Sequence, residues 1–174
     1  RLKARLMPYL YKTAIETSVT GVPTMRSMVL EYTEDKTCHY VDKQYMLGDN
    51  LLVAPIFNDQ SMAEYYLPKG TWTDFFTEKG GCGWITEKHG YLSIPLMVKE
   101  NSIVAIGAHD DKPDYDYGDG AELRLYALKD GKNAEAVVYG MDQKEEIAMT
   151  AKREGNQIHI TVKSDRNYVV RLVN

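Results

Sequence analysis

The chain has 174 residues, of which 44% are hydrophobic and 26% are charged, as in an ordinary globular protein large enough to bury a core. Its formal net charge of -4 argues against a nucleic-acid partner, which would favour a basic face. No apolar run approaches the ~20 residues of a membrane span, so no membrane partner is expected. Cys38 and Cys82 are interpreted as reduced thiols of a cytoplasmic protein, with a single bridge as the alternative.

Residues 1–20 carry the pattern of a helix. Apolar side chains recur at helical spacing, at Leu2, Leu6, Tyr9 or Leu10, Ala14 and Ile15. Gly21 is a natural end for this helix, with Pro23 following, and Pro8 either kinks the helix or marks its true start. The apolar face needs a partner, which in a longer protein would lie upstream. In this chain alone we expect it to dock on the first β-domain, to contact a neighbouring molecule or to be mobile.

From Thr24 onward the pattern changes to short strands. The segments predicted as strands are 24–32, 51–57, 64–67, 70–75, 91–94 and 97–105. The continuous apolar run 51–57 indicates a buried strand, with Pro55 marking an edge or a bulge near its end. Residues 40–46 are ambiguous and favour a short helix, whereas the glycines of 80–83 predict a loop.

A second boundary falls in the polar connector 107–120. Beyond it the alternation is regular and predicts a five-stranded antiparallel unit, with hairpin-type turns at 129–132 and 154–156. The predicted fold is therefore mainly β: two consecutive antiparallel β-sandwich domains preceded by one helix. The expected domains are 1–22, 23–107 and 108–174.

Several segments resemble, in the correct order, the C-terminal part of glycoside hydrolase family 31. They are RLMPYLY at 5–11, DKQYMLGDNLLVAPI at 42–56, YLPKGTWTD at 66–74 and PLMVKENSI at 95–103. TMRSM at 24–28 and HGYLSIP at 89–95 look more like the bacterial α-xylosidase branch. The resemblance implies that residues 1–22 are the last helix of a (β/α)8 catalytic barrel, followed by the proximal and distal β-domains of the family.

The same resemblance implies a parent enzyme that removes terminal α-linked xylose or glucose with retention. Such an enzyme uses two Asp residues, about 5–5.5 Å apart, and no metal. No acidic residue of this chain matches the family's catalytic segments, so no catalytic, cofactor-binding or metal-binding residue is predicted here. Asp42, Asp49 and Asp74 lie in family-like segments, where turn formation and capping are expected of them. The implied partners are the upstream barrel, an oligosaccharide substrate and, as a further option, a second copy of the protein.

Two parts of the sequence contain residue types that could bind a metal. Cys38, His39, Cys82 and His89 do not have the paired spacing of a zinc site. The acidic run 114–119 partly resembles a calcium loop, but Gly118 occupies the third ligand position and Leu125 stands where a bidentate Glu belongs. A solvated connector is favoured.

Exposed aromatic side chains could stack on sugar rings. The candidates are Trp72, Trp84 and the pair Tyr115 and Tyr117. The family resemblance implies that Trp72 packs inside the first domain. Trp84 is the better candidate for exposure, although packing between domains is favoured over sugar binding. The alternative to an enzyme fragment is a free-standing β-sandwich module that binds a carbohydrate or a protein without catalysis.

Overall fold

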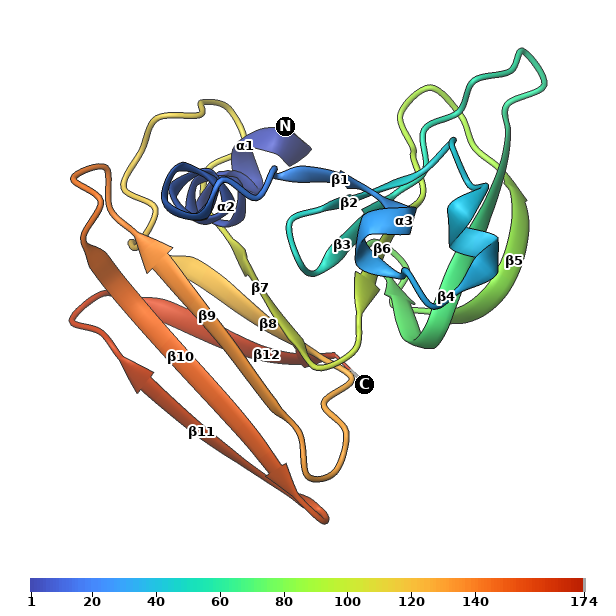
Figure 1. Cartoon of the computed structure of the whole chain (residues 1–174). Helices are drawn as coiled ribbons and strands as arrows, with labels where there is room; N and C mark the ends of the chain where they lie inside the picture. Colours follow the sequence, from blue (N-terminus) through green and yellow to red (C-terminus); the bar gives the residue numbers. More distant parts are fainter. Residues whose placement is uncertain (174) are drawn as a thin grey trace. The chain divides into compact units, whose positions relative to one another are not determined.

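A computed structural model describes residues 1–173, which form two compact units. We call residues 23–100 the proximal unit, and residues 1–22 together with the part of the chain from residue 101 the distal unit. Both are built mainly from antiparallel strands, which confirms the predicted mainly β fold class (Figure 1). Within the described residues, no helix is both long and apolar enough to cross a membrane.

The proximal unit contains a single six-stranded sheet, with the strand order β1-β2-β3-β6-β4-β5. All of its strand pairs are antiparallel. The elements are β1 Met25–Ser27, α3 Met28–Glu31, the 3-10 helix η1 Lys36–His39, β2 Tyr45–Leu47, β3 Leu51–Val53, β4 Met62–Asp74, β5 Gly80–Lys88 and β6 Leu96–Lys99.

The core of the proximal unit draws on α3, η1 and four strands. Its buried members are Met28, Cys38, Met46, Leu52, Ala54, Ala63, Tyr65, Leu67, Trp72 and Met97. The expected packing role of Trp72 is confirmed, because its side chain is 1% exposed and its indole N–H donates to the Pro68 carbonyl at 2.9 Å. The burial expected of the 51–57 run is confirmed at its start, where Leu51 and Leu52 are fully buried. The strand is shorter than expected, because β3 ends at Val53 and Phe57 is 69% exposed.

Several local predictions in this unit are wrong. The strand expected over 24–32 gives way to α3 after Ser27. Residues 40–46 form no helix, because η1 ends at His39 and β2 begins at Tyr45. The Asp35 side chain accepts from the Thr37 backbone N–H at 3.0 Å and so caps η1 earlier in the chain. The 91–94 segment is not a strand, because the Ser93 hydroxyl and the Gly90 backbone close a turn there.

The glycines of 80–83 begin β5 instead of forming a loop. A Cβ on Gly81 would lie 2.9 Å from Ile85 and 3.0 Å from Leu67, so only glycine fits against these side chains without displacing them. The two strand segments expected at 64–67 and 70–75 are parts of one strand, β4, whose pairing with β5 shifts register between Leu67 and Trp72.

The distal unit is a sandwich of two three-stranded sheets, ordered β11-β10-β9 and β12-β8-β7. Figure 1 shows the first of these sheets in front of the second. The elements are α1 Leu2–Arg5, α2 Met7–Thr20, β7 Ser102–Ile106, β8 Ala121–Tyr126, β9 Asn133–Tyr139, β10 Glu145–Glu154, β11 Gln157–Lys163 and β12 Tyr168–Val173. β12 pairs with β8 in parallel, so the expected purely antiparallel unit is corrected at this pair.

The boundary between the β-domains lies between residues 100 and 101, not after residue 107 as expected. The run 97–105 was interpreted as one strand, but a turn at Asn101, with φ of 57°, divides it into β6 and β7. β7 then pairs with β8, Ile103 opposite Leu125, and thereby joins the distal unit. The core between the two distal sheets includes Ile103, Leu123, Leu125, Val138, Ile147 and Met149.

The N-terminal helix belongs to the distal unit. Gly21 ends it in the left-handed conformation, with φ of 75°, as predicted, and Pro8 stands in the first turn of α2, after a break at Leu6. Its buried face consists of Leu6, Tyr9 and Thr13, whereas Ala14 of the predicted face is exposed. Met7 and Tyr11 pack against the distal core. The three alternatives expected for this face did not include the distal unit, on which the helix packs.

Candidate functional site

The three acidic residues of the family-like segments, Asp42, Asp49 and Asp74, do not share one site. The Asp74 carboxylate accepts from the backbone N–H groups of Phe76 at 3.0 Å and Thr77 at 2.6 Å, which is the expected capping role. Asp49 forms an ion pair with Arg26 at 2.7 Å, and Asp42 is exposed. The first two carboxylates thus stabilise turns and loops.

Arg26 is a buried charge that sequence reasoning did not single out. Its guanidinium forms ion pairs with Glu31 and Asp49 and donates to the Pro23 and Gly48 carbonyls. Burial alone would lower the pKa of Arg26, but hydrogen bonds to Glu31 and Asp49 raise it. The guanidinium is therefore held charged and ties β1 to the turn between β2 and β3.

The candidate zinc ligands do not come together. Cys38 is buried and Cys82 is exposed, and both are free thiols. A ring nitrogen of His39 lies 2.7 Å from the Thr33 carbonyl, and His89 contacts Glu87 and Ser93. Among residues 1–173 there is no group of three or more His, Cys, Asp or Glu that could hold a metal ion.

The calcium-like run 114–119 is an internally bonded turn. The Asp116 carboxylate accepts from the backbone N–H groups of Gly118 at 3.1 Å and Asp119 at 3.3 Å. Its second oxygen lies 3.0 Å from the Arg166 guanidinium. These contacts engage the carboxylate that a cation would need, which supports the connector interpretation.

Tyr115 and Tyr117 are buried and cannot present a ring face to a sugar. The Tyr115 hydroxyl donates to the Ala4 carbonyl at 2.7 Å, and the Tyr117 hydroxyl donates to the Pro113 carbonyl at 2.8 Å. Their rings pack edge to face, with centroids 4.9 Å apart. Both are therefore packing residues of the distal unit.

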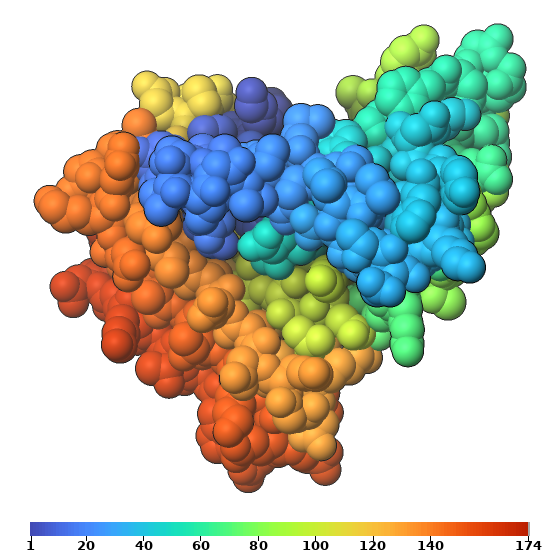
Figure 2. Space-filling view, viewed as in Figure 1, coloured from blue at the N-terminus to red at the C-terminus, as the bar shows by residue number. Residues whose placement is uncertain are grey.

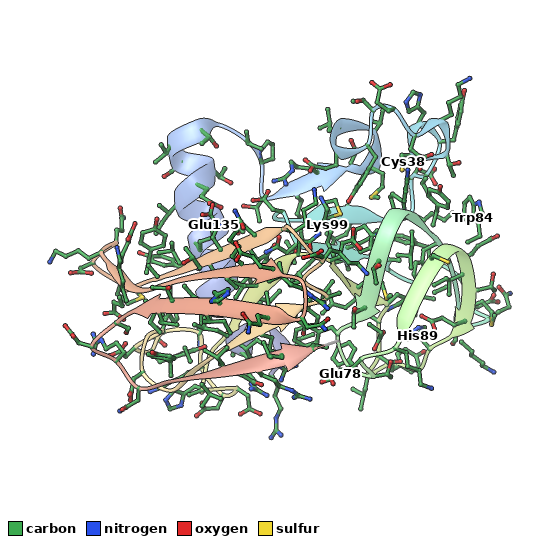
Figure 3. All side chains as sticks on the ribbon, turned by 90° about the horizontal axis from the view of Figure 1, so that it is seen from below. Cys38, Glu78, Trp84, His89, Lys99 and Glu135 are labelled. Atoms are coloured by element: carbon green, nitrogen blue, oxygen red, sulfur yellow. The ribbon has the colours of Figure 1, made fainter. Side chains whose placement is uncertain are left out.

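Trp84 is the aromatic candidate that stays accessible, with its side chain 57% exposed. It lies opposite Tyr66 on neighbouring strands β5 and β4, and the ring centroids are 5.4 Å apart at an interplanar angle of 49°. Figure 3 shows the Trp84 side chain at the outer side of the proximal unit. We call Trp84 and Tyr66 the aromatic platform.

A hollow of about 250 Å³ is found on the same unit. Glu64 and Thr86 line it. They form a cross-strand pair of β4 and β5, two residues along each strand from the pair Tyr66 and Trp84. Because alternate residues of a strand share a face, Thr86 and Trp84 lie on the same side of β5. The complete lining is Lys43, Pro55, Phe57, Asn58, Met62, Ala63, Glu64 and Thr86.

A second hollow, of about 570 Å³, contains a hydrogen-bonded network that sequence reasoning missed. A Glu87 oxygen accepts from the Tyr65 hydroxyl at 2.8 Å and lies 2.9 Å from the His89 Nε2 atom. The Ser93 hydroxyl lies 3.1 Å from Nδ1 of the same ring. The i, i+2 spacing of Glu87 and His89 on a strand was the available signal.

This network is a hydroxyl–imidazole–carboxylate series, but its hydroxyl closes a turn. Ser93 Oγ accepts from the Gly90 N–H at 3.0 Å and donates to the Gly90 carbonyl at 3.3 Å. Burial, followed by the hydrogen bond to Glu87, raises the pKa of Tyr65. The arrangement fixes the loop after β5 and does not present an activated nucleophile.

The electrostatics of the distal unit centre on Glu122. Burial would raise the pKa of this carboxyl, but the hydrogen bond and charge of Arg124, with Arg171 and Arg5, lower it. A glycosidase general acid needs the opposite shift, toward a raised pKa. Glu122 is therefore an ion-pair residue that joins α1, β8 and β12.

Comparison with known proteins gives two matching families in consecutive order. Residues 21–104 match the glycosyl hydrolase family 31 C-terminal domain, and residues 116–174 match the C-terminal domain of alpha-xylosidase YicI. The chain thus belongs to glycoside hydrolase family 31, and it corresponds to the C-terminal part of such an enzyme.

Two relatives are α-xylosidases. XylQ of Lactiplantibacillus pentosus is 37% identical over 151 residues, which are 82% of this chain and 20% of that protein. The α-xylosidase of Emericella nidulans is 34% identical over 131 residues, 70% of this chain and 17% of that protein. The chain therefore spans about a fifth of the length of these relatives.

The fold matches a solved family 31 enzyme as well. The Flavobacterium johnsoniae dextranase, determined with glucose, has a TM-score of 0.81 and 27% identity. The match covers 97% of this chain and 24% of the dextranase chain.

Proposed function

We propose that this chain is the non-catalytic C-terminal region of a retaining, exo-acting α-glycosidase. The parent enzyme would hydrolyse terminal α-linked xylose or glucose, with its two catalytic carboxylates on an upstream barrel. The observation that carries the proposal is the pair of consecutive matches to C-terminal domains over 21–104 and 116–174. Within this chain, the described residues before these matches form the helices α1 and α2.

The contacts of the acidic residues support this role. Asp74 and Asp116 cap turns, while Asp49 and Glu122 are paired with arginines. Retention requires two carboxyl groups facing each other across a sugar, about 5–5.5 Å apart, one of them protonated. Carboxylates engaged with backbone N–H groups or guanidinium groups are poorly suited to that chemistry.

Xylose and glucose both remain within the proposal. The two relatives described above are α-xylosidases, whereas others are an α-glucosidase of Bacillus thermoamyloliquefaciens and an isomaltosyltransferase of Sporosarcina globispora. The free thiols of Cys38 and Cys82 support a cytoplasmic location for the parent. Self-association of the parent stays a prediction.

A free-standing binding module is the second candidate function, and the exposed aromatic platform favours it. The upstream open reading frame distinguishes the two candidate functions. An enzyme requires several hundred upstream residues with barrel-like βα units, whereas a module requires an initiator Met just before Arg1.

The experiment for the non-catalytic role uses the pure 174-residue chain. We expect no release of phenol from aryl α-xylosides or aryl α-glucosides above the buffer rate. Turnover that disappears on substitution of a single Asp within the chain would overturn the proposal. Circular dichroism run in parallel establishes that the assayed chain is folded.

A further inference from the structure

We propose that the outer face of β4 and β5 binds an oligosaccharide of α-linked glucose or xylose, with a sugar ring stacked on Trp84. The site consists of the aromatic platform and the hollow beside it. It goes beyond the proposed function, because it gives this chain a ligand of its own whether or not the chain has catalytic activity.

The platform offers an apolar surface of the size of a sugar ring. Trp84 keeps more than half of its side chain exposed, and Tyr66 supports it from the neighbouring strand. A large exposed indole is a rich source of binding energy, because it combines apolar area with few rotatable bonds. The C–H faces of a pyranose are apolar and pack against such a ring.

The platform is also held rigid. The Gln44 side chain is 4% exposed and makes two hydrogen bonds of 2.7 Å to the Tyr66 backbone, one to its N–H and one to its carbonyl. The Tyr66 hydroxyl donates to Asp35 at 2.9 Å. A surface fixed in this way loses little conformational entropy on binding, which favours a weakly interacting ligand such as a sugar.

Hydrogen-bond donors and hydrogen-bond acceptors lie next to the platform. The Glu64 carboxylate is an acceptor, the Thr86 hydroxyl is both donor and acceptor, and the Lys43 ammonium is a donor. All three line the hollow. Sugar hydroxyls donate and accept at once, so a mixed lining of this kind complements them. The hollow, about 250 Å³, is below the ~300–1,000 Å³ of drug-sized ligand sites and suits a single sugar residue.

Other partner classes fit this face less well. A nucleic acid would bring phosphates toward Glu64 on a chain with a net charge of -4. A stable protein interface buries about 800 Å² on each partner around an apolar centre, whereas here two rings are followed at once by Glu64, Thr86 and Lys88 on the same face. An oligosaccharide combines apolar C–H faces with hydroxyl groups, and it therefore matches both the aromatic platform and the polar lining of the hollow.

The test is a titration of the 174-residue chain with isomaltotriose and, separately, with a xylose-bearing xyloglucan oligosaccharide. The two indole N–H groups, of Trp72 and Trp84, give separate signals in ¹⁵N-correlated NMR spectra. With at least one sugar, we expect the Trp84 signal to shift to saturation while the signal of the buried Trp72 stays in place. No shift with either sugar, or equal shifts of both signals, would overturn the proposal.

Variants localise the binding. Trp84→Ala should weaken sugar affinity by about tenfold or more, equivalent to ~1.4 kcal/mol. Trp84→Phe, which keeps an aromatic face, should retain most of it, and Glu64→Gln should weaken it by a smaller factor. Tyr40→Ala is the control, because Tyr40 is an exposed aromatic residue of the same unit that belongs neither to β4 and β5 nor to the lining of the hollow. Unchanged affinity in Trp84→Ala would contradict the site. Hydrolysis is assayed separately from binding. The proposed sugar site and the proposed non-catalytic role can therefore each fail without the other.

Discussion

Single buried residues hold each unit together, and the sequence indicated some of them. The run 51–57 predicted buried positions because it is continuously apolar, and Leu51 and Leu52 are indeed fully buried. Arg26 could not be identified in this way. Its burial depends on Glu31, Asp49 and the Gly48 carbonyl, which only the folded turn brings to one place.

Leu52→Ala should destabilise the proximal unit by about 2–5 kcal/mol, because it removes a fully buried side chain and leaves a cavity. Urea unfolding followed by tryptophan fluorescence measures this change, since both tryptophans lie in the proximal unit. Leu92→Ala is the control, at a fully exposed position, and should leave the midpoint in place. A Leu52→Ala midpoint equal to that of the wild type would show that the strand lies elsewhere.

The two thiols should differ in reactivity. Burial, with a smaller effect of the Asp35 charge, raises the pKa of Cys38 to about 11, whereas Cys82 is exposed. Because the thiolate is the reactive form, a disulfide reagent near pH 8 should modify Cys82 quickly and Cys38 only after denaturation. The Cys82→Ser variant should show no fast phase. Equal rates for both thiols in the native chain would contradict the placement of η1.

At the scale of elements, the sequence predicted those that depend on local patterns and missed those that depend on pairing. The helix end at Gly21 follows from nearby residues, the burial of Trp72 was implied by the family resemblance, and both are confirmed. The glycines of 80–83 suggested a loop, but they form β5 because β4 supplies a partner. The boundary after residue 107 failed for the same reason, since β7 pairs with β8.

The aromatic candidates show the same division. Tyr115 and Tyr117 lie in an acidic stretch of the sequence, which suggested exposed side chains. Both are nevertheless buried in the distal core. Trp84 was expected to be exposed, and it is, but its stacking on Tyr66 depends on the register of β4 and β5, which sequence alone did not give.

Removing residues 1–20 should destabilise the distal unit and leave the proximal unit folded. The sequence boundary at Gly21 suggested that both β-domains would survive, but Leu6 and Tyr9 are buried and Met7 and Tyr11 pack on the distal core. Tryptophan fluorescence should report unchanged melting of the proximal unit, while far-ultraviolet circular dichroism should show an earlier transition. An unchanged dichroism melt would mean that the helix contributes no stability.

The contact of α1 with the distal loop should depend on pH. Burial, with the charge of Tyr117, raises the pKa of Tyr115 to about 12, so the protonated hydroxyl is favoured in the folded state. Its stabilising effect is complete below the unfolded pKa of about 10 and is lost as the pH rises from about 10 to 12.

Tyr115→Phe removes the hydrogen bond to Ala4 and should cost about 0.5–1.5 kcal/mol at neutral pH. The difference in stability between the wild type and this variant should shrink as the pH approaches 12. Denaturant unfolding at pH 7, 10 and 11 measures it, and Tyr91→Phe, at a fully exposed position, is the control. A difference that stays constant with pH would contradict the buried hydroxyl.

At the scale of the whole molecule, the chain corresponds to the C-terminal part of longer enzymes. It spans about a fifth of the α-xylosidases it matches, and its two units are both of the C-terminal type. Part of α2 lies uncovered on the surface shown in Figure 2, and Val19 on this helix is 79% exposed.

The most direct test of the central claim is hydrolysis by the complete polypeptide encoded by the gene, assayed beside the 174-residue chain at equal molar concentration. The substrates are aryl α-xyloside and aryl α-glucoside, and proton NMR identifies the anomer released first. We expect the complete polypeptide to release the α-anomer from at least one substrate, while the short chain releases nothing above the buffer rate. Equal turnover by the short chain, or a complete polypeptide that hydrolyses neither substrate, would contradict it.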